Sequence, residues 1–298
     1  MEDKCHYVCS RGLLKSCDFH STNPRSSCGN DIGYLIEMLK SDKMYDGMTI
    51  YVCSNLLSFF AKHISHKLVC KFVLVSGDSD TNVPYEAMTQ VEADMLFDNV
   101  LMLRWYSQNT THPRIHQLPI GLDYHTISNN PAHHWRQQNE PFSPAEQERI
   151  LCRVRDDAMN AKRNNKILVN FTLGNDRFGQ RRSAMSAINR KLLNIRQENV
   201  PRTELWKLMA THTFVLSPFG MGMDCHRTWE ALCLGCIPIV MTSLLSREFD
   251  GLPILIVDDW RQITEKLLAD TIDKFKTQAF TLDKLLLSYW VEKLTMVL

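Results

Sequence analysis

The segment 217–232 carries glycine, acidic and basic residues in a spacing suited to an anionic ligand. It follows a predicted strand and opens a predicted helix, whose N-terminus carries about half a positive charge and suits a phosphate. Gly220 and Gly222 let backbone N–H groups come close to a ligand. Arg227 can grip phosphate oxygens, and Glu230, three residues later on the same helix face, can accept hydrogen bonds from ribose hydroxyls. The alternative is an ordinary strand-turn-helix corner with a surface Arg–Glu pair.

A dinucleotide-binding fingerprint is the main rival for this segment. Gly220 and Gly222 supply the first two glycines of G-x-G-x-x-G, but Cys225 stands at the third position. A side chain there prevents the close helix–strand packing that the fingerprint needs, so NAD and FAD are set aside. Asp224 is the expected N-cap, and its charge would partly oppose a bound anion. A Cys225 nucleophile is disfavoured because the side chain of its neighbour, His226, diverges from it on a helix.

A second strand-to-helix connection, 170–182, places Arg181 and Arg182 near a helix start. From that position the two guanidinium groups could reach a diphosphate. A solvated basic end of a helix is the alternative of equal weight.

Carboxylates follow another predicted strand, in Ser76-Gly-Asp-Ser-Asp80. The carboxyl end of a strand is a usual place for side chains that do chemistry. Asp78 and Asp80 have the form of the D-x-D motif that holds a divalent metal with a sugar nucleotide. The alternative is a polar turn, because Gly, Asp and Ser favour turns for backbone reasons.

The ten cysteines raise the question of a zinc site near the N-terminus. Cys5 and Cys9 have a spacing that zinc ligands use, but the positions of the other candidates are irregular, namely Cys17, His20 and Cys28. Thiols that are buried or incidental are therefore favoured. Buried thiols are also expected in apolar strand or helix contexts at Cys53, Cys70, Cys233 and Cys236.

Short apolar runs alternate with helical patterns along the chain, which is typical of parallel sheets covered on both faces. Strands are expected at 48–53, 68–75, 99–106, 166–171, 213–216, 236–241 and 253–257. Helices are expected at 55–63, 84–96, 144–162, 182–193, 203–211, 224–234, 260–268 and 282–297, with Gly235 ending one of them in the left-handed conformation. The pattern predicts an α/β fold of two doubly wound Rossmann-like halves, with the carboxyl ends of the strands facing a cleft.

The charges are nearly balanced, with 34 Lys and Arg against 33 Asp and Glu in 298 residues. Non-specific nucleic-acid binding needs a surplus of cations, so no nucleic-acid partner is expected. A spanning helix needs about 20 apolar residues, and the densest apolar run, 231–241, is broken by Gly235 and Pro238. The first residues lack the pattern of a signal peptide. We therefore expect no anchor, no membrane partner, a cytoplasmic location and reduced cysteines.

The stretch Ser217-Pro-Phe-Gly-Met-Gly-Met-Asp-Cys-His-Arg-Thr-Trp-Glu, continuing to residue 240, and the stretch 252–260 resemble the exostosin-like glycosyltransferases. The resemblance is nearest to the branch with the ribitol-5-phosphate xylosyltransferase and the glycosyltransferases of large algal viruses. It is densest from 166 to 260, and most specific at Arg227, Glu230, Gly235 and Pro238. The first half matches more loosely, through 72–84, 105–109 and 118–121.

The resemblance implies a GT-B fold, in which two Rossmann-like domains face a cleft. Residues 1–158 would bind the acceptor and 159–279 the sugar nucleotide, with the helix 280–298 packing back on the first domain. The implied activity is an inverting transfer of a sugar, with xylose favoured, from a UDP-sugar to a hydroxyl of a glycan acceptor. No metal or other cofactor is implied, and a virus-encoded enzyme fits the missing anchor.

The resemblance and the residue pattern together assign individual roles. The donor is assigned to Thr172, Arg181, Arg182, Ser217, Phe219, Gly220, Gly222, Asp224, Arg227 and Glu230. The acceptor is assigned to Asn109 and Gly121, and the general base to Asp80, with Asp78 as its close competitor. Two alternatives stay open. One is a metal-dependent GT-A-type enzyme that uses Asp78 and Asp80 as metal ligands, and the other is a non-catalytic protein that binds a sugar nucleotide or a glycan.

Overall fold

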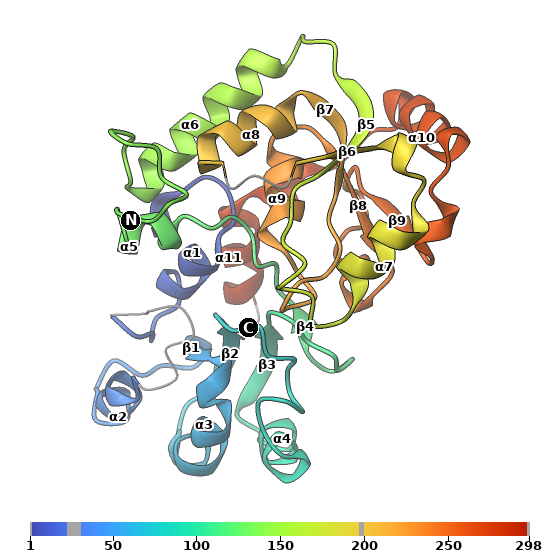
Figure 1. Ribbon diagram of the computed structural model, residues 1–298. Helices are drawn as coiled ribbons and strands as arrows, with labels where there is room; N and C mark the ends of the chain where they lie inside the picture. The colour runs from blue at the N-terminus through green and yellow to red at the C-terminus, as the bar shows by residue number, and fades with distance from the viewer. Residues whose placement is uncertain (1, 23–30, 197–199, 297–298) are drawn as a thin grey trace. The chain divides into compact units, whose positions relative to one another are not determined.

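The computed structural model describes residues 2–22, 31–196 and 200–296, and it divides into two compact units that are each built on one parallel sheet (Figure 1). The four-stranded unit comprises Val8–Ile120 and Leu287–Leu298, and the five-stranded unit comprises Met1–Tyr7 and Gly121–Leu286. The expected α/β class with two all-parallel sheets, consistent with two Rossmann-like domains, is confirmed.

The sheet of the four-stranded unit has the order β1-β2-β3-β4. Its strands are β1 (Met48–Cys53), β2 (Phe72–Gly77), β3 (Met102–Ser107) and β4 (His116–Gln117). Every residue of β2 is buried, as expected for a parallel strand covered on both faces. The helices of this unit are α1 (Ser10–Lys15), α2 (Gly33–Met38), α3 (Leu57–His63), α4 (Gln90–Phe97) and α11 (Leu287–Thr295).

One helix boundary in the four-stranded unit differs from the expectation of a helix over 84–96. The helix α4 begins only at Gln90, because Thr89 and Glu92 form a reciprocal capping box. The capping box fixes the start of the helix, and the preceding residues 84–88 form turns instead.

The sheet of the five-stranded unit has the order β6-β5-β7-β8-β9. Its strands are β5 (Asn164–Val169), β6 (Leu193–Ile195), β7 (His212–Leu216), β8 (Ile237–Met241) and β9 (Leu255–Val257). The chain pairs β6 on one side of β5 and then crosses over to place β7 on the other side. The point between β5 and β7 where the strand order reverses is a topological switch point, the usual place for a ligand in such sheets.

Helices cover both faces of this sheet (Figure 1). The helices of this unit are α5 (His125–Asn129), α6 (Pro144–Ala158), α7 (Gln180–Ala187), α8 (Arg202–Ala210), α9 (His226–Cys233) and α10 (Glu265–Thr277). One core cluster joins Ile167, Phe214 and Ile239 of the strands to Ala184 of α7 and Leu268 of α10. In addition, α8 packs against β7 and α9 against β8. This half is therefore doubly wound.

The helix expected over 182–193 is wrong in its second half. The helix α7 ends at Ala187, and Ile188 is already extended, with φ −80° and ψ 134°. Leu193–Ile195 then forms β6, which pairs with β5. A strand of three residues is too short to show a period of two in the sequence, so the helical pattern hid it.

The units also differ from the expected division after residue 158. The segment 121–158 belongs to the five-stranded unit, because its helix α6 packs against α8. Two polar contacts reinforce this packing: Gln147 Oε1 accepts from Arg202 Nη1 at 3.1 Å, and Thr203 Oγ1 donates to Glu140 Oε2 at 2.9 Å.

Among the described residues, no helix is long and apolar enough to cross a bilayer.

Candidate functional site

The switch point of the five-stranded sheet gathers two arginines around one aromatic ring. Arg181 comes from α7 and Arg227 from α9, and their guanidinium carbons lie 5.4 and 5.5 Å from the centre of the Phe171 ring. Phe171 lies two residues after the end of β5. Arg181 Nη1 donates to the Thr172 carbonyl at 2.7 Å, and Arg227 Nε donates to the Asn170 carbonyl at 3.1 Å. Backbone carbonyls at the carboxyl end of β5 therefore hold both cations.

These two cations make no direct salt bridge in the part of the chain that the structure describes. Neither Arg181 nor Arg227 forms an ion pair with a carboxylate there. Burial lowers the pKa of Arg227, and the Arg181 guanidinium adds to this shift, while Cys225 and Glu230 oppose it without cancelling it. Two like charges that repel each other in a partly dry site favour a ligand with two negative charges, such as a diphosphate.

Gly220 has a different role from the one expected. A Cβ at this position would lie 2.5 Å from Arg181 Nη2, so the absence of a side chain lets Arg181 lie over the loop. Arg181 Nε also donates to the Phe219 carbonyl at 3.3 Å. The N–H of Gly220 donates to the Gly222 carbonyl and that of Ser217 to the Ile239 carbonyl. These two backbone donors serve the fold rather than a ligand.

Glu230 lies buried on α9, one turn after Arg227. Its Oε1 accepts a hydrogen bond from the indole Nε1 of Trp206 at 3.1 Å. The hydroxyls of Ser217 and Thr228 lie 2.8 Å apart and join the loop after β7 to the same helix. Trp206 thus holds the Glu230 carboxylate in one orientation, and Glu230 is near enough to Arg227 to raise the pKa of that arginine.

Asp224 is not the N-cap of α9, which is Cys225. Both Asp224 oxygens accept from the indole Nε1 of Trp229 at 3.0 Å, and Oδ1 also accepts from the Cys225 backbone. The buried Asp224 therefore anchors Trp229. Burial raises the pKa of the Cys225 thiol, which further disfavours a nucleophilic role.

Arg182 points away from the ring that Arg181 covers. Its side chain is 62% exposed and pairs with Asp176 Oδ2 at 3.3 Å. The Asp176 carboxylate also accepts the backbone N–H groups of Arg181 and Arg182 at 2.9 and 3.0 Å. The N-terminus of α7 is thus already neutralised within the fold.

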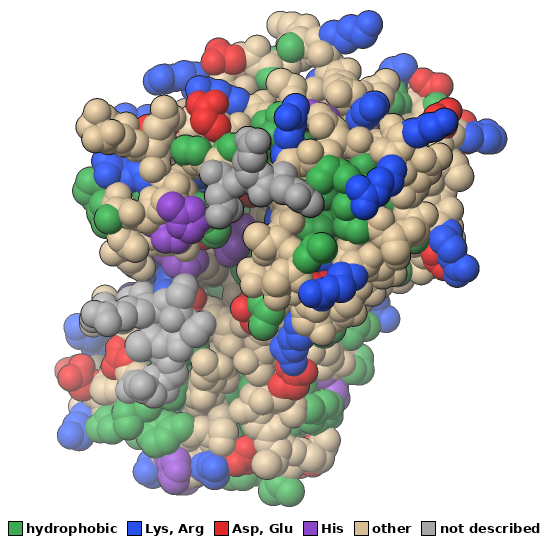
Figure 2. All heavy atoms as spheres, viewed as in Figure 1, with side chains coloured by type: hydrophobic (Ala, Val, Ile, Leu, Met, Phe, Trp, Pro, Cys, Tyr) green, Lys and Arg blue, Asp and Glu red, His purple; other side chains and the backbone are tan. Residues whose placement is uncertain are grey.

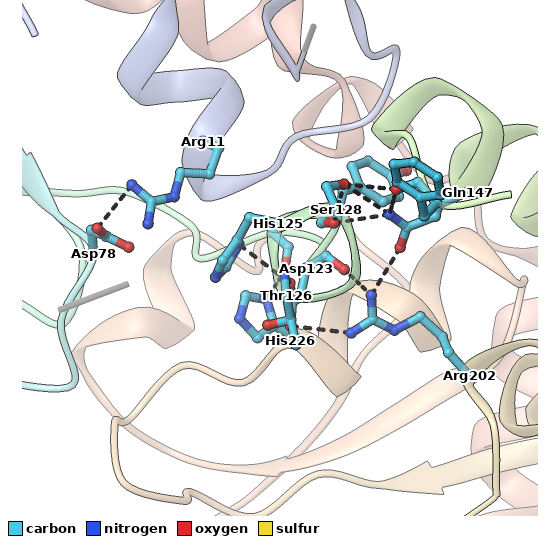
Figure 3. A network of polar contacts seen from close by, with 12 residues as sticks. Arg11, Asp78, Asp123, His125, Thr126, Ser128, Gln147, Arg202 and His226 are labelled. Carbon is cyan, nitrogen blue, oxygen red and sulfur yellow. Dashed lines mark hydrogen bonds and ion pairs between the residues drawn. The ribbon is translucent and has the colours of Figure 1, made fainter. Parts of the chain in front are cut away.

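In the four-stranded unit, Asp78 forms an ion pair with a buried arginine (Figure 3). Arg11 Nη1 lies 3.0 Å from Asp78 Oδ2, and the two side chains are 2% and 7% exposed. This contact lacks hydrogen-bond geometry, and the three guanidinium nitrogens have no hydrogen-bond partner among the described residues. Burial, and then the charge of Asp78, raise the pKa of Tyr51. The Asp78 carboxylate thus serves to balance the charge of the buried Arg11.

Replacing Asp78 with asparagine is therefore expected to destabilise the protein. The change leaves the buried Arg11 charge without its ion pair, which costs about 3–5 kcal/mol in comparable cases. Urea unfolding measures the loss. The matched control is Asp80→Asn, which changes an exposed side chain and should leave the unfolding midpoint nearly unchanged. Equal midpoints for the two variants would contradict this account of Asp78.

The two residues predicted to bind the acceptor each make a polar contact within their own unit. Asn109 is fully buried, has φ +50°, and donates from Nδ2 to the Ser79 carbonyl at 3.0 Å. Gly121 has φ +62°, and its carbonyl lies 2.7 Å from His226 Nδ1. Both residues position loops, and their contact with an acceptor stays a prediction.

A buried network around Asp123 was missed by the sequence analysis (Figure 3). Asp123 Oδ1 lies 3.2 Å from His125 Nδ1, and Oδ2 lies 3.1 Å from Arg202 Nη2. The Asp123 carbonyl also accepts from Arg202 Nη1. Burial alone would raise the pKa of Asp123, but His125, Arg202 and the nearby His226 outweigh it and hold this pKa far below its usual value. The only signal in the sequence was an Asp-x-His pair in an otherwise apolar stretch.

The described cysteines are all free thiols, and Cys28 lies outside the described residues. Cys5, Cys9, Cys17, Cys233 and Cys236 are buried, whereas Cys53 and Cys70 are only partly buried. Within the described ranges, no group of three or more His, Cys, Asp or Glu side chains is arranged to hold a metal. On the face drawn in Figure 2, basic and acidic side chains are interspersed.

No protein-family model matches this chain, and no curated protein matches it significantly.

Proposed function

We propose that this protein is an inverting glycosyltransferase of the GT-B type. It would move a sugar, with xylose favoured by the resemblance, from a UDP-sugar to a hydroxyl of a glycan acceptor. The observation that carries the proposal is the pair Arg181 and Arg227, two cations that form no direct ion pair with a carboxylate among the described residues, at the switch point of a parallel sheet. Ligands of such sheets bind at that point, outside the carboxyl ends of the strands.

The reaction is a single displacement at the anomeric carbon. The acceptor oxygen forms a bond to this carbon while the bond to the diphosphate oxygen breaks, and the electron pair leaves with UDP. The proton of the acceptor hydroxyl passes to a general base. Arg181 and Arg227 stabilise the negative charge that grows on the diphosphate, and Glu230 accepts hydrogen bonds from the ribose.

The metal-dependent alternative needs Asp78 as a ligand. The 3.0 Å ion pair with Arg11 opposes that role, since a divalent cation would have to share this carboxylate with a buried guanidinium. The non-catalytic alternative is separated by turnover: a binding protein takes up UDP or glycan and releases no UDP from a donor.

Release of UDP from a panel of UDP-sugars tests the proposal. With EDTA present, we expect one donor to release UDP slowly by hydrolysis and faster with an acceptor. The same donor should raise the melting temperature by mass action. Activity that EDTA abolishes and Mn²⁺ restores would favour the metal-dependent alternative, and binding without any UDP release would favour the non-catalytic one.

Glu230→Gln is expected to weaken UDP binding by about tenfold, which is the worth of roughly one hydrogen bond to a charged group. Glutamine keeps an oxygen for Trp206, so the fold is retained while the acceptor for the ribose is lost. Calorimetric titration with UDP and with 2′,3′-dideoxy-UDP measures the effect. The wild-type protein should lose affinity for the dideoxy compound, and the variant should bind both alike. A variant that still distinguishes the two as the wild type does would refute the ribose role.

A further inference from the structure

His226 is the first residue of α9 and directly precedes Arg227. Its Nδ1 lies 2.7 Å from the Gly121 carbonyl oxygen. Because a carbonyl only accepts, Nδ1 carries the proton and Nε2 holds a lone pair. The φ of +62° at Gly121 is one that glycine adopts readily, so this position sets the carbonyl that orients the ring.

The Nε2 atom of His226 makes no hydrogen bond within the described part of the chain, and the side chain is only partly buried. A ring held in one tautomer, with its basic nitrogen available, is suited to accept a proton. The geometry is that of an oriented base rather than of a histidine used to hold the fold.

Ionisable groups of the same unit lie near His226. The centres of the His125 and His226 rings lie 6.3 Å apart (Figure 3). His226 also contributes to the lowered pKa of Asp123, whose carboxylate pairs with His125 and Arg202. The other charged groups near His226 on α9 are Arg227 and Glu230.

We propose that His226 is the general base of the sugar transfer, in place of Asp80 or Asp78. This inference rests on the proposed function. Nε2 takes the proton of the acceptor hydroxyl while its oxygen bonds to the anomeric carbon. The bond from that carbon to the diphosphate breaks, the electron pair leaves with UDP, and His226 becomes an imidazolium beside Asp123.

Two features of the structure support His226 over the aspartates. It lies in the same unit, and on the same helix, as Arg227 and Glu230, which would hold the donor. By contrast, Asp78 is engaged with Arg11, and Asp80 is an exposed side chain.

The test compares His226→Asn with wild-type protein, using the donor found in the UDP-release screen. The asparagine amide can still donate to the Gly121 carbonyl, but it offers no base at the position of Nε2. We expect kcat to fall about 10²- to 10⁴-fold, the usual worth of general-base catalysis, and UDP affinity to change less than about threefold. The fall of wild-type kcat on the acidic side of its pH profile should disappear in the variant. The matched control is His66→Asn, at an exposed histidine of the other unit, which should behave as wild type.

A second variant, His226→Gln, keeps the test decisive if the asparagine variant loses UDP binding through misfolding. The inference is overturned if a variant that binds UDP normally also keeps wild-type kcat and pH profile, or if Asp80→Asn abolishes transfer while His226→Asn does not. A wild-type protein that binds no UDP would instead overturn the proposed function.

Discussion

Arg227→Met is expected to weaken UDP binding by about 10- to 150-fold and to leave the melting temperature unchanged or higher. A hydrogen bond to a charged group contributes about 1.5–3 kcal/mol, which corresponds to that loss of affinity. Methionine keeps most of the apolar stem but removes one of two cations that repel each other beside Phe171. A residue that binds a ligand but destabilises the fold is expected to show both effects when it is replaced: weaker ligand binding and an unchanged or higher melting temperature.

Calorimetric titration with UDP and a thermal melt without ligand measure the two effects. Arg182→Met is the matched control, since that side chain is largely exposed and pairs with Asp176. It should bind UDP within about twofold of wild type, as expected for a weak surface ion pair outside the site. If Arg227→Met instead lowers stability and leaves UDP affinity intact, then Arg227 is a structural residue.

Asp123→Asn is expected to destabilise the protein by about 3–5 kcal/mol, because it leaves the buried Arg202 charge without its carboxylate. Urea unfolding at pH 7 measures the change. Asp270→Asn is the control, since it removes an exposed pair with Lys266 and should not shift the midpoint measurably. An unchanged midpoint in Asp123→Asn would show that the network contributes no stability.

We also expect the effect of Asp123→Asn on the free energy of unfolding to depend on pH. The pKa of Asp123 is lower in the folded protein than in the unfolded chain, where it is about 3.9. The stabilisation it supplies is therefore fully present above that unfolded value and is lost progressively as the pH falls below it. The gap in unfolding free energy between wild type and Asp123→Asn should be widest at pH 7 and should narrow from about pH 4 downward. A gap that grows on acidification would contradict the assigned sign.

Much of the five-stranded unit was predictable because its strands are apolar runs between clear helix signals. The strand β8 and the left-handed Gly235, at φ +71°, lie as expected. Strand pairing was not predictable, since a sequence pattern does not show which strand lies beside which. The switch point between β5 and β7 therefore became visible only in the fold.

The sequence also does not show which of two neighbouring arginines faces the site. Adjacent residues of a helix point about 100° apart, so Arg181 and Arg182 cannot both face one site, and the sequence does not say which one does. The fold turns Arg181 over Phe171 and leaves Arg182 exposed. The pairing of Asp123 with Arg202 spans 79 residues and left no local signal.

A calorimetric comparison of UDP, UMP and uridine tests most directly whether Arg181 and Arg227 hold the diphosphate of a sugar nucleotide. With EDTA present, we expect UDP to bind wild-type protein at least about tenfold more tightly than UMP, and uridine to bind most weakly, because each phosphate adds charge-assisted hydrogen bonds. Equal affinities for UDP and uridine, or no binding of UDP, would show that the two arginines do not hold a diphosphate.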